Sequence, residues 1–350
     1  MIRPLHQPLP TPPQTQPPNP APPQTTGASL PIARRPYQEP LERHDLGRMD
    51  QACTKCDALH WLLERTTAAG SSNSHPLFSM CCENGNVRLP AMALPPTQLA
   101  YFFSDNTPEA RWFRDHIRQY NAALAFTSLG VKVDNTVNTG GGPPTFRIHG
   151  ELCHQLGSLL PRNGEQPVYA QLYIYDPRLA LDHRMHRNPG LDPNVMRRLQ
   201  HLILTHHRWA ATFQQASNVF QQTHCQDISI QLAVNRNRDQ RRFNLPTSDE
   251  VAVIVPGDGT QSYGHRDIVV RLQDGPLQRI SDGSAMYECL QYPLLFIYGE
   301  DGYHYDLQMS PTKEYRLSQT DYVAYRIQQR LGEFSLLLHA GRLLQQYLVL

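Results

Sequence analysis

The sequence CTKC at residues 53–56, followed by the adjacent pair CC at residues 81–82, decides how the front of this chain folds. A two-residue spacer lets one tight turn direct two thiolates at the same ion, and tetrahedral zinc takes four such ligands. Because residues 49–95 offer few apolar side chains, metal binding would supply much of their folding free energy. We therefore expect a zinc-finger-like module over residues 49–95. Its expected ligands for structural Zn²⁺ are Cys53, Cys56, Cys81 and Cys82.

Two other interpretations of these cysteines stay open. A Cys-x-x-Cys pair can be a redox centre, although a thioredoxin-like pair lies between a strand and a helix of a parallel sheet, which this context does not suggest. Adjacent cysteines can also be ordinary buried apolar residues. Within the zinc interpretation, His60 is an alternative ligand if Cys81 and Cys82 do not both reach the ion.

The distribution of charge limits how the chain could bind nucleic acid. Its 350 residues carry 32 Lys and Arg against 31 Asp and Glu, a formal net charge of +1, so no global field attracts DNA. Any contact must be local, and clustered arginines are the candidates because guanidinium groups bind phosphates well. Solvated helix or loop faces are the alternative, and Arg241 and Arg242 could instead pair with neighbouring carboxylates. The candidate DNA-binding residues are Arg184, Arg187, Arg197, Arg198, Arg236, Arg238, Arg241 and Arg242.

Composition also indicates the compartment. Residues 1–48 are rich in Pro, Gln and Thr and are expected to form a disordered tail, without the pattern of a targeting peptide. No stretch has the length of an apolar membrane span, so no membrane role is expected. The seven cysteines do not resemble a disulfide framework, which favours a reducing compartment. We expect an intracellular protein, nuclear or cytoplasmic.

Hydrophobic periodicity predicts an α+β fold. Apolar residues recur at helical spacing over residues 108–125 and again over residues 192–223, which begin with a capping Asp followed by Pro. Alternation predicts a strand over residues 168–175. A capping box at residues 318–321 begins a C-terminal helical segment. Strands that would form an antiparallel sheet are expected at residues 228–234, 250–255, 267–272 and 277–280.

Sequence signals for catalysis are weak. The glycines at residues 140–142 are followed by prolines, not by the Lys and hydroxyl residue of a Walker A loop. Acidic and histidine residues in the last third of the chain suggest a metal-dependent nuclease, but Gly, Asp and Glu are also ordinary turn residues. These residues are His265, Asp267, Glu300, Asp301, His304 and Asp306. We expect no enzymatic activity from this chain and no small-molecule substrate.

Several long phrases, in order along residues 49–350, give the chain a family resemblance. They are CTKCDALHW (53–61), FSMCCENGNVRLP (78–90), IRQYNAALAFTSLG (117–130), FRIHGELCHQLGSLLP (146–161), RDQRRFNLPTSDEVAVIVPGD (238–258), LQYPLLFIYGEDGYHYDL (290–307) and DYVAYRIQQR (321–330). In these phrases the chain resembles the amino-terminal region of Helitron transposases, the rolling-circle replication and helicase proteins of eukaryotic DNA transposons. The resemblance implies a protein of a mobile element whose zinc-finger-like module helps to engage DNA.

The resemblance also implies where the chemistry of the family lies. A later initiator domain uses a His-hydrophobic-His pair to hold a divalent cation and tyrosines to attack a DNA phosphate, and an ATP-driven helicase follows. No two histidines stand two positions apart in this chain, so both catalytic parts are expected to be missing. We expect a truncated fragment made of the tail (1–48), the zinc module (49–95), an α+β domain (96–310) and the start of the helicase-like domain (311–350).

Two functions follow as expectations. The first is a non-catalytic fragment that binds DNA through its zinc module and local basic patches. The alternative is an interaction scaffold that docks other transposase or host proteins through its C-terminal helix, which would then leave an apolar stripe exposed along residues 322–350.

Overall fold

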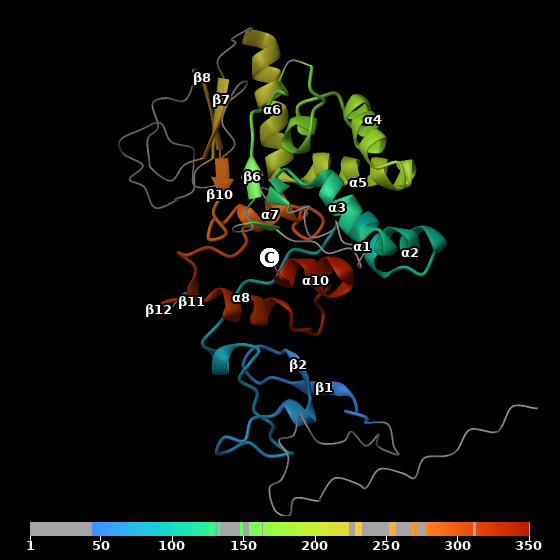
Figure 1. Ribbon diagram of the computed structural model, residues 1–350. Helices are drawn as coiled ribbons and strands as arrows, with labels where there is room; N and C mark the ends of the chain where they lie inside the picture. The colour runs from blue at the N-terminus through green and yellow to red at the C-terminus, as the bar shows by residue number, and fades with distance from the viewer. Residues whose placement is uncertain are drawn as a thin grey trace, which may run out of the picture. The chain divides into compact units, whose positions relative to one another are not determined.

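The computed structural model describes residues 44–129, 132–133, 148–149, 154–162, 164–223, 228–232, 252–256, 268–271, 278–310 and 313–349. Helices combine with small antiparallel sheets in one compact unit that spans residues 46–350 (Figure 1). The expected α+β class is therefore confirmed. Most of the expected tail over residues 1–48 lies outside the described residues. Within the described part of the chain, no helix is both long enough and apolar enough to cross a bilayer.

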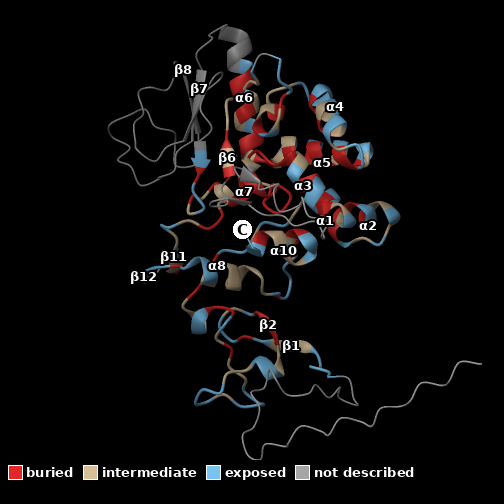
Figure 2. Ribbon diagram, viewed as in Figure 1, coloured by how far each residue is buried: buried red, intermediate tan, exposed pale blue. Residues whose placement is uncertain are grey.

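Helices form the larger hydrophobic core. Buried positions lie along these helices (Figure 2). The fully buried side chains include Phe113, Leu199, Phe213 and Leu343. Burial of a side chain of this size contributes about 1.5–3 kcal/mol to stability. The helices of this core are α1 (Thr97–Ser104), α2 (Pro108–Asp115), α3 (Ile117–Leu124), α5 (Pro193–His206), α6 (Arg208–Thr223), α7 (Tyr287–Gln291), α9 (Leu336–His339) and α10 (Arg342–Val349).

Both long helices expected from the sequence are broken in two. His116 separates α2 from α3, and His207, with extended backbone angles, separates α5 from α6. The ring of His207 is buried, stacks on Phe126 and lies 3.3 Å through Nε2 from the carbonyl oxygen of Cys289. Each break lets two short helices turn their apolar sides to the same core, so packing overrides the continuous periodicity. The start of α5 is as expected, with Asp192 capping its first turn.

Residues 168–175 are not a strand, so this expectation was wrong. They form the 3-10 helix η5 (Tyr169–Tyr173), which leads into α4 (Pro177–Arg187). The side chain of Gln171 accepts a hydrogen bond from the backbone N–H of Val168 and donates one to the carbonyl oxygen of Ser158, each at 2.9 Å. These local bonds close a turn where a strand would need partners on a neighbouring strand.

The strands pair antiparallel in small sheets. Three of the four strands expected after residue 227 pair in the order β8-β7-β9, whereas the fourth, β10, joins the order β10-β6-β3. In the first of these sheets Ile230 lies opposite Ile254 on one side and Val270 on the other. The strands of these two sheets and of the separate β4–β5 pair are β3 (Ser128–Leu129), β4 (Lys132–Val133), β5 (Ile148–His149), β6 (His154–Leu156), β7 (Ile228–Leu232), β8 (Ala252–Pro256), β9 (Ile268–Arg271) and β10 (Gln278–Ile280).

The cysteine-containing segment packs against residues far along the chain. Val87 and Leu89 share a small core with Tyr303, Leu317 and Tyr322. The elements on the two sides of this contact are β1 (Met49–Ala52), β2 (Leu59–Trp61), η2 (Leu62–Glu64), η3 (Glu83–Gly85), the hairpin β11 (Gln308–Ser310) with β12 (Lys313–Arg316), and α8 (Gln319–Arg326).

Backbone hydrogen bonds join the same two segments. The N–H of Arg88 donates to the carbonyl oxygen of Met309 and the N–H of Leu59 donates to that of Gln329, each at 2.8 Å. The boundary expected between residues 310 and 311 lies within the β11–β12 hairpin. Residues 49–95 therefore pack against residues 303–310 and 313–330.

Glu288 on α7 is a buried carboxyl group that makes stability depend on pH. The hydroxyl of Tyr322 donates to its Oε2 at 3.3 Å, and burial raises the pKa of Glu288 from 4.5 to about 7. Unfolding lowers this pKa, so between these two values the native state holds a proton that the unfolded chain has lost. The contribution of Glu288 to stability therefore falls as the pH rises through this window and is constant above about pH 7.

Glutamine carries no charge at any pH. We therefore expect the free energy of unfolding of Glu288→Gln, relative to that of the unmodified chain, to rise by about 3 kcal/mol from about pH 4 to about pH 8. Urea unfolding of both proteins at the two pH values measures this difference, in which the contributions of all other titrating groups cancel. A difference that does not change with pH would show that Glu288 has the same pKa in the native and the unfolded chain.

Candidate metal centre

The first two cysteines lie on the tight connection between β1 and β2. The N–H of Cys53 donates to the carbonyl oxygen of Ala58 at 2.8 Å, and the N–H of Asp57 donates to that of Cys53 at 2.9 Å. Asp57 has a φ of +59°, in the left-handed region, which reverses the chain directly after Cys56. The turn thus points both thiols of the CTKC sequence to one side.

The second pair of cysteines lies on a similar turn. The N–H of Gly85 donates to the carbonyl oxygen of Cys82 at 2.9 Å and lies 3.2 Å from its Sγ. Gly85 has a φ of +86°, which residues other than glycine rarely adopt. A Cβ at this position would lie 3.2 Å from the Cβ of Lys55. Glycine is therefore required where this turn approaches the CTKC turn.

The two turns bring all four cysteines together. Their Sγ atoms lie within 4.8 Å of one another, with 3.9 Å between Cys53 and Cys82 and 3.8 Å between Cys81 and Cys82. In a tetrahedral site with metal–sulfur bonds of about 2.3 Å, neighbouring sulfurs are about 3.8 Å apart. The cysteines are free thiols, and within the described residues they are the one group of three or more side chains that could hold a metal ion.

The electrostatics of the cluster favour a bound cation. Cys53, Cys81 and Cys82 are buried and Cys56 is partly exposed. A hydrogen bond with Cys81 lowers the pKa of Cys56, and the same contact raises the pKa of Cys81, while burial raises that of Cys82. The thiolate form of Cys56 is thus stabilised, and the thiolate forms of Cys81 and Cys82 are disfavoured. A divalent ion would replace the remaining protons and offset the negative charge of all four sulfurs.

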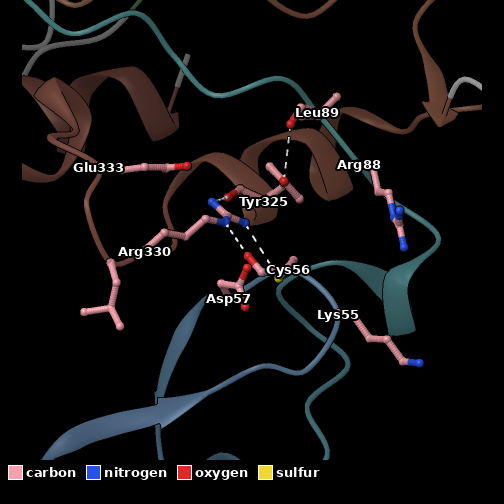
Figure 3. Close-up of a pocket in the computed structure, with 9 residues that line it drawn as sticks. Lys55, Cys56, Asp57, Arg88, Leu89, Tyr325, Arg330 and Glu333 are labelled. Carbon is pink, nitrogen blue, oxygen red and sulfur yellow. Dashed lines mark hydrogen bonds between the residues drawn. The ribbon is translucent and has the colours of Figure 1, made fainter.

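Arg330 also contacts the cluster, and no pattern in the sequence predicts this contact. Its Nε donates to the carbonyl oxygen of Cys56 at 3.0 Å, its Nη2 lies 3.9 Å from the Cys56 Sγ, and its Nη1 donates to the carbonyl oxygen of Tyr325 at 3.0 Å (Figure 3). The guanidinium also stacks over the Tyr325 ring at 3.9 Å. Such donors orient thiolate ligands and offset their charge.

His60, the alternative ligand, does not belong to the cluster. Its ring is buried, stacks on Phe78 with 4.1 Å between centroids, and contacts the Glu64 carboxylate through Nδ1 at 2.8 Å. His60 therefore supports the loop between the two cysteine pairs through packing.

The structure places the candidate DNA-binding arginines differently from one another. Arg184 is buried, with Nε donating to the carbonyl oxygen of Ala123 at 3.0 Å, so it is not available to a DNA phosphate. Arg198 is paired with Glu109 at 2.9 Å. Arg187 and Arg197 are exposed. The other four lie outside the described residues: Arg236, Arg238, Arg241 and Arg242.

The acidic residues considered for a nuclease site do not gather where the structure describes them. Asp301 pairs with Arg208 at 2.6 Å, and the Glu300 carboxylate accepts a hydrogen bond from the N–H of Tyr298 at 3.1 Å. His265 and Asp267 lie outside the described residues.

Comparison with protein-family models and with curated proteins found no match for this chain.

Proposed function

We propose that this protein is a non-catalytic, zinc-stabilised DNA-binding protein of the Helitron transposase type. The observation that carries this proposal is the convergence of four thiols at the spacing of a tetrahedral metal–thiolate site. Zinc fits this donor set best, because four thiolates in a tetrahedral arrangement select zinc over the cations that prefer oxygen ligands. The phrases quoted above support the family assignment.

Exposed cations on two parts of the fold support contact with DNA. Lys55 and Arg88 lie beside the cysteine cluster. Arg197 lies with Arg178 along a cavity of about 910 Å³ between α4 and α5. Because the formal net charge is only +1, such local groups must supply the attraction to phosphates.

The scaffold function is less well supported. On α10 the apolar residues Leu343 and Tyr347 are buried in the core, and the exposed apolar side chains of this helix are Leu348 and Val349. On α8 Tyr322 is also buried. Of the apolar stripe that a docking segment would present, the described residues 322–349 leave Leu331, Leu348 and Val349 exposed.

We expect purified chain that contains one zinc ion per molecule to retain single- or double-stranded DNA in a manner that weakens with salt. The substitution pair Arg187→Gln and Arg197→Gln should weaken binding about ten-fold at low salt, whereas Arg111→Gln with Arg118→Gln, two exposed arginines on α2 and α3, should not. Fluorescence anisotropy with labelled oligonucleotides at several salt concentrations measures both. Folded, zinc-loaded protein that fails to retain DNA would refute the proposed function.

A further inference from the structure

A pocket lies directly beside the candidate metal centre. Its volume is about 390 Å³, within the range of small-ligand pockets. The residues that line it come from both sides of the contact between the cysteine turns and the segment after α8 (Figure 3). Those with polar or aromatic side chains that bear on its chemistry are Lys55, Asp57, Arg88, Tyr325, Arg330 and Glu333.

The charges around this pocket are separated. In Figure 3 Lys55 and Arg88 lie on one side of Cys56, while Asp57, Arg330 and Glu333 lie on the other. The charge of Arg330 is opposed by the carboxylates of Asp57 and Glu333 on the same side, and its donors are engaged by Cys56 and Tyr325. The uncompensated positive charge therefore lies with Lys55 and Arg88. Neither Lys55 nor Arg88 forms an ion pair with a described residue.

Local contacts hold the backbone of Arg88 and the stem of Lys55 beside the cluster. The stem of Lys55 lies against Gly85, and the N–H of Arg88 is hydrogen-bonded to Met309 at 2.8 Å. A competing role for both cations would be to offset the charge of a metal–thiolate centre. Arg330 already has that role through its contact with the Cys56 sulfur at 3.9 Å, and neither Lys55 nor Arg88 has a side-chain hydrogen bond to a described cysteine.

We propose that this pocket binds one nucleotide of single-stranded DNA, with its phosphate against Lys55 and Arg88. This inference rests on the DNA-binding function proposed above and says what the first of the two parts of the fold named there would bind. The amino groups of a base are hydrogen-bond donors that suit the carboxylates of Asp57 and Glu333, whereas a second phosphate there would be repelled. A duplex keeps its bases paired, so a single strand, whose bases can turn outward, fits this distribution of charge.

The test compares two charge-matched pairs of substitutions in the full chain. Lys55→Gln with Arg88→Gln removes the pocket cations, and Arg111→Gln with Arg118→Gln removes two exposed cations elsewhere. Anisotropy with a labelled single strand should show about ten-fold weaker binding for the pocket pair, and a slope of log K against log salt that is smaller by about 1.4. The control pair should stay within about two-fold of the unmodified chain. Metal content should remain stoichiometric in both.

The outcomes separate this inference from the function on which it rests. If the unmodified chain binds no DNA, both fail. If it binds DNA and the pocket pair binds as tightly as the control pair, the pocket assignment alone is overturned. Loss of metal from the pocket pair would show that these cations serve the metal centre and would also overturn it. An unlabelled duplex should compete with the labelled strand more weakly than an unlabelled single strand of equal length, and equal competition would exclude a nucleotide pocket.

Discussion

Replacing Cys81 with serine is expected to abolish metal binding and to unfold residues 49–95. The core around the cysteines contains only Cys53, Ala58, Phe78, Cys81 and Cys82, with Cys56 and Tyr325 packed against it. Even with the small core that Val87 and Leu89 share with Tyr303, Leu317 and Tyr322, these contacts cannot offset the conformational entropy of the segment. That entropy amounts to about 1–2 kcal/mol per residue for the backbone alone. In the proposed function this cluster holds zinc, and structural zinc contributes about 10–16 kcal/mol in zinc-finger peptides, so the loss of a ligand would remove most of the stabilising free energy.

The loss of structure should extend to residues 319–333, which lie far along the chain from residues 49–95. Arg330 donates a hydrogen bond to the carbonyl oxygen of Cys56, and Tyr325 packs against the cluster. The N–H of Leu59 donates to the carbonyl oxygen of Gln329. Hydrogen–deuterium exchange of the variant, or of unmodified protein treated with a chelator, should therefore show lost protection in both segments. The helices around Phe113 and Leu199 belong to the larger core and should keep theirs.

Two variants make this result specific. Cys289→Ser changes a buried cysteine of the larger core, outside the cluster, and should retain one metal ion per chain. Arg330→Gln should also retain the metal, because it leaves the thiols in place. Residues 319–333 should nevertheless lose protection from exchange, because the substitution removes the contacts with Cys56. Metal content by colorimetric assay and exchange by mass spectrometry report these outcomes. Full protection of residues 49–95 after chelation would show that the segment folds without a metal.

Local sequence encodes the parts of the structure that short-range chemistry determines. The CTKC spacing predicts a tight turn with two thiols on one side, and the turn forms as expected. Asp192 and Ser318 each cap a helix at the position where the pattern places its start. In each case the residues that interact are no more than a few positions apart, so the sequence pattern and the three-dimensional contact coincide.

Long-range contacts explain what the sequence did not reveal. Arg330 reaches Cys56 across most of the chain, and no spacing rule connects them. The break at His207 depends on the contact with the carbonyl oxygen of Cys289, and the turn at residues 169–173 depends on the hydrogen bond to Ser158. Periodicity reports which residues will be buried, but tertiary partners decide where a helix stops.

Arg184 shows the same limit for a candidate functional residue. It stands in a basic run, RMHR at residues 184–187, which is equally typical of a DNA-binding face and of an exposed helix. The structure buries it instead, because Ala123, Gln200 and Tyr173 surround its guanidinium. Arg187, three positions later on α4, is exposed. The packing of α4 against α3, α5 and η5 distinguishes these two arginines.

Replacing Arg184 with methionine is therefore expected to destabilise the protein by about 3 kcal/mol. The side chain donates through Nε to the carbonyl oxygen of Ala123 at 3.0 Å and through Nη1 to Oε1 of Gln200 at 2.7 Å. Its guanidinium lies over the ring of Tyr173 at 4.8 Å. Methionine fills a similar volume but donates nothing, so two buried acceptors lose their partners, at a cost of about 1–3 kcal/mol each.

Urea unfolding measures this effect, and Arg187→Met on the same helix is the matched control, expected to change stability by less than about 0.5 kcal/mol. Arg184→Lys should lie between the two, because an ammonium group restores a donor but cannot reach both acceptors in the fixed geometry of a guanidinium. DNA retention distinguishes this structural role from a role at the surface. If Arg184→Met keeps its full stability but binds DNA more weakly, the buried position of Arg184 and the packing of α4 against α5 would both have to be wrong.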